Sequence, residues 1–129
     1  MMEHKKQIIT ENAPSPAGPY SQGIVSGGYL FVSGQRPQNP RTGKIPEDIQ
    51  DQTSQVISNL EAILKTYGCT LGDVVRCTVY LSDIKFFNQM NDIYSVRFPK
   101  PYPTRTTIGV QLRGIDIEMD VIARLHEEV

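Results

Sequence analysis

One long amphipathic segment in the middle of the chain most constrains the fold. Between residues 46 and 67, side chains at three- and four-residue spacing form a single stripe: Ile49, Thr53, Val56, Ile57, Leu60, Ile63, Leu64 and Tyr67. Glu47, Asp48 and Asp51 place negative charge in the first turns, where the helix dipole favours it, and Gly68 supplies a stop. A chain of 129 residues is long enough for one core. We therefore expect a single domain over residues 1–129, built around this helix.

Strand patterns flank the helix on both sides. Residues 23–25 and 29–33 read as a hairpin around Ser26-Gly27-Gly28. Residues 73–81 alternate, with Val75, Cys77, Val79 and Leu81 expected on one side. A second helix is expected to begin at Ser82 or Asp83, to present Phe87, Met90, Tyr94 and Phe98 on one face, and to end before three prolines at 99, 101 and 103. Two more strands follow, at residues 104–111 and 115–125.

This order of elements predicts an α+β fold in which two helices pack on one face of a mixed sheet. Apolar side chains occur on both sides of the later strands. We therefore expect a neighbouring subunit to cover the second face of the sheet.

Composition narrows the possible functions. The net charge is −1 with scattered charges, which does not favour nucleic acid or an anionic membrane as a partner. The start MMEHKKQ lacks the apolar run of a secretory signal, and the most apolar run, Tyr29 to Val32, is too short to span a bilayer. Cys69 and Cys77 lack C-x-x-C spacing and read as reduced thiols of a cytoplasmic protein. His4 and His126 have no ligand-spaced partner, so no metal site is expected.

The last two strands carry the most informative polar residues. Arg105, Thr107, Gly109 and Gln111 share one face of the first strand, and Asp116, Glu118, Asp120 and Ile122 share one face of the second. We expect the cation and the three carboxylates on the same side of the sheet. An arginine fork there matches a ligand carboxylate, and Glu118 has the chemistry to orient or deprotonate water. The alternative is a solvated face on which Arg105 only pairs with the acids.

The expected connection between these strands creates a distance problem. A tight hairpin centred on Arg113-Gly114 places Arg105 opposite Ile122, about four residues or ~13 Å along the strand from Glu118. Long side chains, a bulge, a bridging water or a subunit boundary would have to close that gap.

Short motifs run through nearly the whole chain in order. They are N-A-P at 12–14, G-P-Y-S-Q-G at 18–23, V-S-G-Q at 32–35, N-P-R-T-G at 39–43, Asp51-Gln52-Thr53, Asn59-Leu60, Asn91-Asp92-Ile93-Tyr94, P-T-R-T-T at 103–107 and I-E-M-D-V-I-A at 117–123. With these motifs in register, the chain resembles the RidA/YjgF family of reactive-intermediate deaminases. That resemblance implies a chorismate-mutase-like fold, a homotrimer with ligand clefts between subunits, and no cofactor.

The resemblance also implies roles for individual residues. Arg105 would hold the substrate carboxylate, Glu118 would position or activate water, and Tyr20 would complete the catalytic set. Thr107, Ser33, Gly34 and Asn91 would bind substrate. Two departures bear on cleft shape and substrate range: Thr107 replaces a frequent cysteine, and Leu112-Arg113-Gly114 replaces a more usual Leu-Pro turn.

The implied activity is hydrolysis of 2-iminobutanoate, 2-iminopropanoate and their 2-aminoacrylate-type enamines to 2-keto acids and ammonia. A second hypothesis is a sensor that binds a small carboxylate such as a keto acid without turnover. A ribonuclease or translation inhibitor is a third, disfavoured by the near-neutral charge and the lack of paired catalytic histidines.

Overall fold

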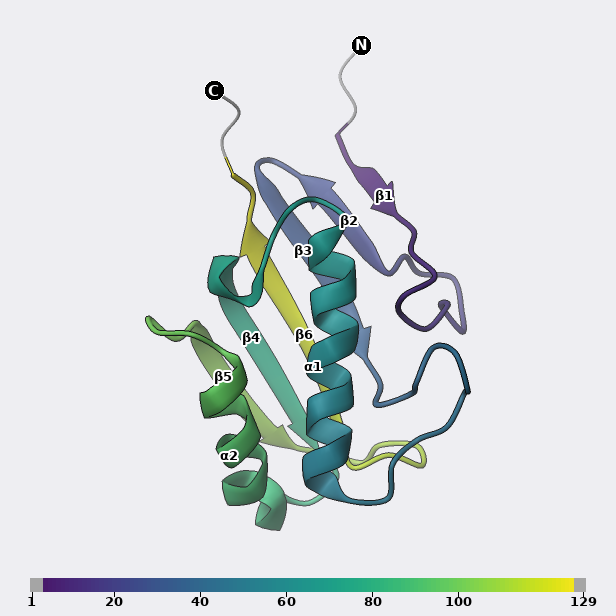
Figure 1. The fold of residues 1–129 in the computed structure, drawn as a ribbon, viewed down its shortest axis with the longest axis vertical. Helices are drawn as coiled ribbons and strands as arrows, with labels where there is room; N and C mark the ends of the chain where they lie inside the picture. The colour runs from purple at the N-terminus through teal and green to yellow at the C-terminus, as the bar shows by residue number, and fades with distance from the viewer. Residues whose placement is uncertain (1–3, 127–129) are drawn as a thin grey trace.

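The computed structural model describes residues 4–126 and shows a single sheet with two helices on one face (Figure 1). The sheet has six strands in the order β1-β2-β3-β6-β4-β5. Their bounds are β1 Lys6–Ile8, β2 Gly23–Ser26, β3 Tyr29–Gln35, β4 Val74–Leu81, β5 Thr104–Gly109 and β6 Ile117–Arg124. The helices are α1, Ile49–Lys65, and α2, Phe87–Arg97. The predicted α+β plan, with two helices on one face of a mixed sheet, is confirmed.

Helix α1 begins at Ile49, directly after the capping residue Asp48. The Asp48 side chain accepts hydrogen bonds from the backbone amides of Gln50 and Asp51, at 3.1 and 3.2 Å, and so satisfies two of the free N–H groups of the first turn. At the other end Gly68 takes a φ of 69°, a left-handed value that suits glycine. The helix is therefore shorter than the expected 46–67. Its stripe is buried: Val56, Ile57, Leu60, Ile63 and Leu64 have no exposed surface.

The second helix begins as expected but in two steps. Asp83, rather than Ser82, caps a short 3₁₀ turn, η2, Ile84–Phe86, which leads into α2. The Ser82 hydroxyl donates instead to Asp116 at 2.7 Å. Met90, Tyr94 and Phe98 are buried against the sheet, so the predicted apolar face of this helix is confirmed.

The first hairpin is also confirmed. Strands β2 and β3 pair around Gly27 and Gly28, whose φ values of 60° and 85° fit a tight two-residue hairpin turn. Strand β1 was not predicted from the sequence. It has only three residues, too few for an alternation to stand out, and it is held by pairing with β2.

The predicted hairpin between the last two strands is wrong. Strand β4 lies between β5 and β6, parallel to the first and antiparallel to the second. The segment between β5 and β6 does not turn back tightly but crosses the end of β4. There the Val110 amide donates to the Leu81 carbonyl, and the Ser82 amide donates to the Asp116 carbonyl. Arg105 therefore pairs with Cys77, and Cys77 pairs in turn with Val121.

A register shift between Val74 and Arg76 changes which side chains of β4 face the helices. Cys77, Val79 and Leu81 are fully buried there as predicted, but Val75 is 44% exposed and Val74 takes the buried place. An extra residue of this kind reverses the alternation on one side of the irregularity.

The face of the sheet away from the helices is open in the single chain. It carries Phe31 and Ile108, 43% and 41% exposed, and Phe31 pairs across strands with Ile122. Among the described residues, no helix is long and apolar enough to cross a membrane.

Candidate functional site

Arg105 and Glu118 lie on opposite faces of the sheet. Arg105 shares the helix-covered face with Cys77, its neighbour in register, and lies against α2. Glu118 alternates with Ile117 and Met119, which are fully buried under the helices, and so lies on the open face. The prediction of a cation and carboxylates on one side of the sheet is therefore wrong. The inserted strand β4 is the reason, because the faces of β5 and β6 are set by their separate pairing with it.

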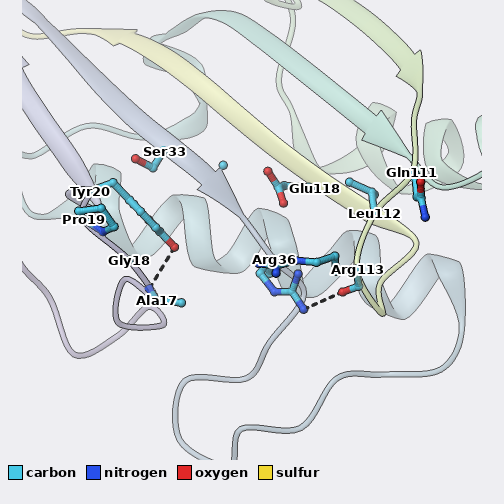
Figure 2. A pocket seen from close by; sticks show the side chains of 11 residues that line it. Ala17, Gly18, Pro19, Tyr20, Ser33, Arg36, Gln111, Leu112, Arg113 and Glu118 are labelled. Atoms are coloured by element: carbon cyan, nitrogen blue, oxygen red, sulfur yellow. Dashed lines mark hydrogen bonds between the residues drawn. The ribbon is translucent and has the colours of Figure 1, made fainter.

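Glu118 lines a cleft of about 950 Å³ at the end of β3 (Figure 2). We call it the Glu118 cleft. Its walls come from four parts of the chain: the loop before β2, the end of β3, the segment between β5 and β6, and the start of β6. The lining residues are Ala17, Gly18, Pro19, Tyr20, Ser33, Gly34, Arg36, Gln111, Leu112, Arg113 and Glu118. Four of the expected site residues, Tyr20, Ser33, Gly34 and Glu118, therefore meet here.

Hydrogen bonds from the surrounding backbone fix two of these side chains. The Tyr20 hydroxyl accepts from the Ala17 amide at 3.2 Å, which folds the phenol back over its own loop while its ring stays 48% exposed. The Ser33 hydroxyl donates to the Ser21 carbonyl at 2.6 Å. The Ser33–Ser21 contact joins the G-P-Y-S loop to the V-S-G-Q strand, and the Tyr20–Ala17 contact stabilises the loop itself.

The environment of Glu118 makes its carboxylate easier to protonate than an ordinary glutamate. Burial raises the pKa of Glu118, nearby Arg36 opposes this, and Asp120 adds to the rise. Desolvation disfavours the charged form, and it outweighs the attraction of the guanidinium here. A carboxyl group with a raised pKa gives up and takes back a proton more readily than an ordinary glutamate, which suits it to proton transfer.

Arg105 lines a separate, smaller cleft of about 570 Å³ beside α2. We call it the Arg105 cleft, and its lining is Asn91, Asp92, Tyr94, Ser95, Tyr102, Pro103 and Arg105. The guanidinium carbon lies 4.6 Å from the centre of the Tyr94 ring and 5.5 Å from that of Phe87. Within residues 4–126 no carboxylate forms an ion pair with Arg105, which does not favour the alternative that it only balances strand acids.

Asn91 and Arg105 thus meet in the Arg105 cleft. Thr107 lies in neither cleft: it is partly exposed on β5, where it pairs with Val79. No group of three or more His, Cys, Asp or Glu in the described part of the chain is arranged to hold a metal ion. Cys69 and Cys77 are buried and free, as predicted.

Sequence reasoning missed Arg36. It follows the V-S-G-Q motif directly and lines the Glu118 cleft, where it donates to the Arg113 carbonyl at 3.1 Å. The available signal was its position, since small residues just before it bring the backbone close to a cleft.

Comparison with known proteins identifies the family. Residues 10–125 match the family model described as Endoribonuclease L-PSP. A RutC family protein of Pyrococcus horikoshii is 44% identical over 125 residues, which cover 96% of this chain and 99% of the relative. The chain belongs to this RidA/YjgF (L-PSP) family. The resemblance drawn from the motifs is confirmed.

Other members of the RidA/YjgF family bear on function. "Putative reactive intermediate deaminase TdcF" of Escherichia coli K12 is 38% identical over 122 residues, covering 92% of this chain and 95% of TdcF. The crystal structure of E. coli TdcF with bound serine has a TM-score of 0.88 at 36% identity, covering 94% and 99% of the two chains. The Rid family protein YyfA of Yersinia pestis has a TM-score of 0.90 at 42% identity, with the same coverage.

Proposed function

We propose that this chain hydrolyses small, reactive 2-imino acids and their enamine tautomers to 2-keto acids and ammonia. The observation that carries the proposal is the division of the site. A guanidinium with no carboxylate partner in the described chain lines one cleft, and a carboxyl group with a raised pKa lines another. The first is suited to an anionic substrate, and the second to moving a proton.

Because these clefts lie on opposite faces of one chain, the proposal includes assembly. We propose a homotrimer in which the Arg105 cleft of one subunit meets the Glu118 cleft of its neighbour. The exposed apolar side chains of the open face, Phe31 and Ile108 among them, would be covered in that assembly. In that assembly Arg105 of one subunit would lie close to Glu118 of its neighbour, although the two residues are on opposite faces within one chain.

Each residue has a role in the proposed reaction. Arg105 pairs with the substrate carboxylate, with Asn91 beside it, and Ser33, Gly34 and Tyr20 bound the opposite side; Thr107 would contribute through its main chain. Glu118 accepts a proton from the water that attacks the imine carbon and returns it to the departing nitrogen. The balance is one imine and one water to one ketone and one ammonia. Because the imine is already electrophilic, positioning accounts for most of the expected acceleration.

A second candidate function is binding of a small amino or keto acid without turnover. The observation in its favour is the structure of the relative TdcF with bound serine. Both candidates use Arg105 as the anion clamp, so only turnover separates them.

The deciding experiment couples the purified protein to a serine/threonine dehydratase, which releases 2-aminoacrylate-type products, and follows keto-acid formation. We expect the keto acid to form faster with the wild-type protein present than with the dehydratase alone, and this acceleration should not change when EDTA is added. Arg105→Lys keeps the charge but loses the fork of the guanidinium, so it should lower kcat/KM severely, and Arg105→Ala, which loses both, should lower it further. The contact with the substrate carboxylate is worth roughly 2–4 kcal/mol, or about 30- to 1000-fold in kcat/KM. Glu118→Gln should lower kcat while calorimetry still detects pyruvate binding.

The matched control is Arg41→Ala, at an exposed turn position outside both clefts. Pyruvate binding by Arg105→Ala equal to that of the wild type would reduce Arg105 to a structural role. Binding of pyruvate without any acceleration of the coupled reaction would favour the sensor.

A further inference from the structure

The Glu118 cleft contains an arginine that has no role in the proposed reaction, Arg36. This residue lies one position beyond β3 and is partly buried in the cleft wall (Figure 2). Its guanidinium donates to the Arg113 carbonyl at 3.1 Å, which fixes it to the segment between β5 and β6. A guanidinium has five N–H donors, so one such bond leaves most of its hydrogen-bonding capacity for a ligand.

Arg36 does not form an ion pair with Glu118. Within residues 4–126, no carboxylate oxygen forms an ion pair with its guanidinium. The rise in the pKa of Glu118 points the same way, because a close ion pair would have lowered it. Arg36 therefore acts on Glu118 only from a distance.

The charge balance of the cleft is positive. Its charged lining residues are Arg36, Arg113 and Glu118, which makes two cations and one anion. When Glu118 takes up a proton the excess becomes two positive charges. An uncharged substrate side chain would leave the partly buried Arg36 without a negative partner, whereas an acidic side chain would match it.

We propose that Arg36 forms a subsite for a second negative group on the substrate, so that the site prefers imino and keto acids with an acidic side chain. This inference rests on the proposed function, which assigns the first carboxylate to Arg105. The preferred substrates are then 2-imino dicarboxylates, the class formed when an acidic amino acid is oxidised at its α-carbon. Arg105 holds the carboxylate next to the imine, and Arg36 holds the distal one.

The test compares two keto acids with the same number of carbons, 2-oxoglutarate and 2-oxopentanoate, of which only the first carries a second carboxylate. Calorimetry measures the ratio of their dissociation constants for the wild type, Arg36→Gln and Arg36→Lys. A charge-assisted contact predicts about tenfold or more preference for 2-oxoglutarate in the wild type. Arg36→Gln should bring the ratio to near one, and Arg36→Lys should retain part of the preference. Arg41→Gln is the matched control, because it removes an exposed arginine outside the cleft.

The outcomes separate this inference from the proposed function. A wild-type protein that binds neither keto acid and does not accelerate the coupled deamination contradicts the proposed function itself. A wild type that binds 2-oxopentanoate as tightly as 2-oxoglutarate overturns only the subsite, as does an unchanged ratio in Arg36→Gln. If Arg36→Gln binds neither ligand, Arg36→Lys decides: retained preference supports the subsite, and equal binding of the two acids refutes it.

Turnover supplies a second readout. Imines generated from glutamate and from 2-aminopentanoate by an amino acid oxidase give kcat/KM values for the same pair of side chains. A subsite predicts that Arg36→Gln lowers the dicarboxylate value at least tenfold more than the monocarboxylate value. If Arg36 acts only on the pKa of Glu118, both values fall together and the pH profiles shift, which would overturn the proposal.

Discussion

The carboxylate of Glu118 occupies the space that a side chain at position 34 would need. A Cβ on Gly34 would lie 3.0 Å from the Glu118 Cδ and 3.3 Å from its Cγ, with the Oε2 atom closer still. Gly34 lies within the register shift between Val32 and Gln35, where β3 departs from regular pairing with β6. The absence of a side chain on β3 therefore sets where the proposed proton-transfer group rests.

Gly34→Ala should consequently impair activity more than stability. The new methyl group meets the end of a flexible side chain, so Glu118 can swing aside, and the free energy of unfolding should change by less than ~1 kcal/mol. Displacing the carboxylate should lower kcat toward that of Glu118→Gln. Thermal melting and the coupled deamination assay measure the two effects. Gly109→Ala, whose Cβ would come no closer than 3.8 Å to another side chain, is the control. A Gly34→Ala protein with full kcat would contradict this placement.

The pH dependence of stability tests the environment of Glu118. Its pKa is raised above the ordinary 4.5, so folding favours the protonated form. Ionisation therefore costs stability: the cost is absent below about pH 4, grows as the pH passes between the unfolded and folded pKa values, and is complete above the folded one. Glutamine does not titrate, so the melting temperature of Glu118→Gln should rise relative to that of the wild type as the pH increases from 4 to 8. A difference that shrinks with rising pH would show a lowered pKa instead.

Tyr94 should hold Arg105 in place through its ring rather than its hydroxyl. The guanidinium lies over the ring, which also stacks on Phe98 at 4.3 Å, whereas the neighbour of the buried hydroxyl is the Cys77 thiol. Tyr94→Phe should therefore keep pyruvate affinity. Tyr94→Leu should weaken it by about 2- to 30-fold, the range of a cation–π contact. Calorimetry with pyruvate provides the comparison, and equal affinities in both variants would rule out a positioning role.

The sequence was sufficient for the elements whose signal is local. The stripe of α1 and the Gly27-Gly28 turn each depend on neighbours within a few residues, and both were predicted. The order of strands in the sheet has no such signal. Nothing in the local pattern of residues 104–125 indicates that β4 enters between β5 and β6.

The residues of the candidate site were likewise predictable from local motifs, whereas their arrangement in space was not. Motif resemblance selected Tyr20, Ser33, Gly34 and Glu118, which share one cleft, and Asn91 and Arg105, which share another. The alternation of side chains along the last two strands predicted Arg105 and Glu118 on the same face of the sheet. That prediction is wrong because it assumed that consecutive strands are adjacent. Arg36 was missed because its importance depends on a fold that brings it against the 111–113 segment.

The open face of the sheet provides the last prediction, which concerns assembly. Phe31 is 43% exposed and pairs with Ile122 across β3 and β6, so a charge at this position would be buried if a neighbouring subunit covers the face. Phe31→Glu should dissociate the proposed trimer and, because each site needs two subunits, abolish deamination. Ile9→Glu is the matched control: Ile9 is 77% exposed just after β1 and lines neither cleft, so its substitution should leave the trimer intact. Sedimentation velocity at micromolar concentration distinguishes the species. A wild type that sediments as a monomer would refute the trimer, and an active monomeric Phe31→Glu protein would show that a single chain holds the whole site.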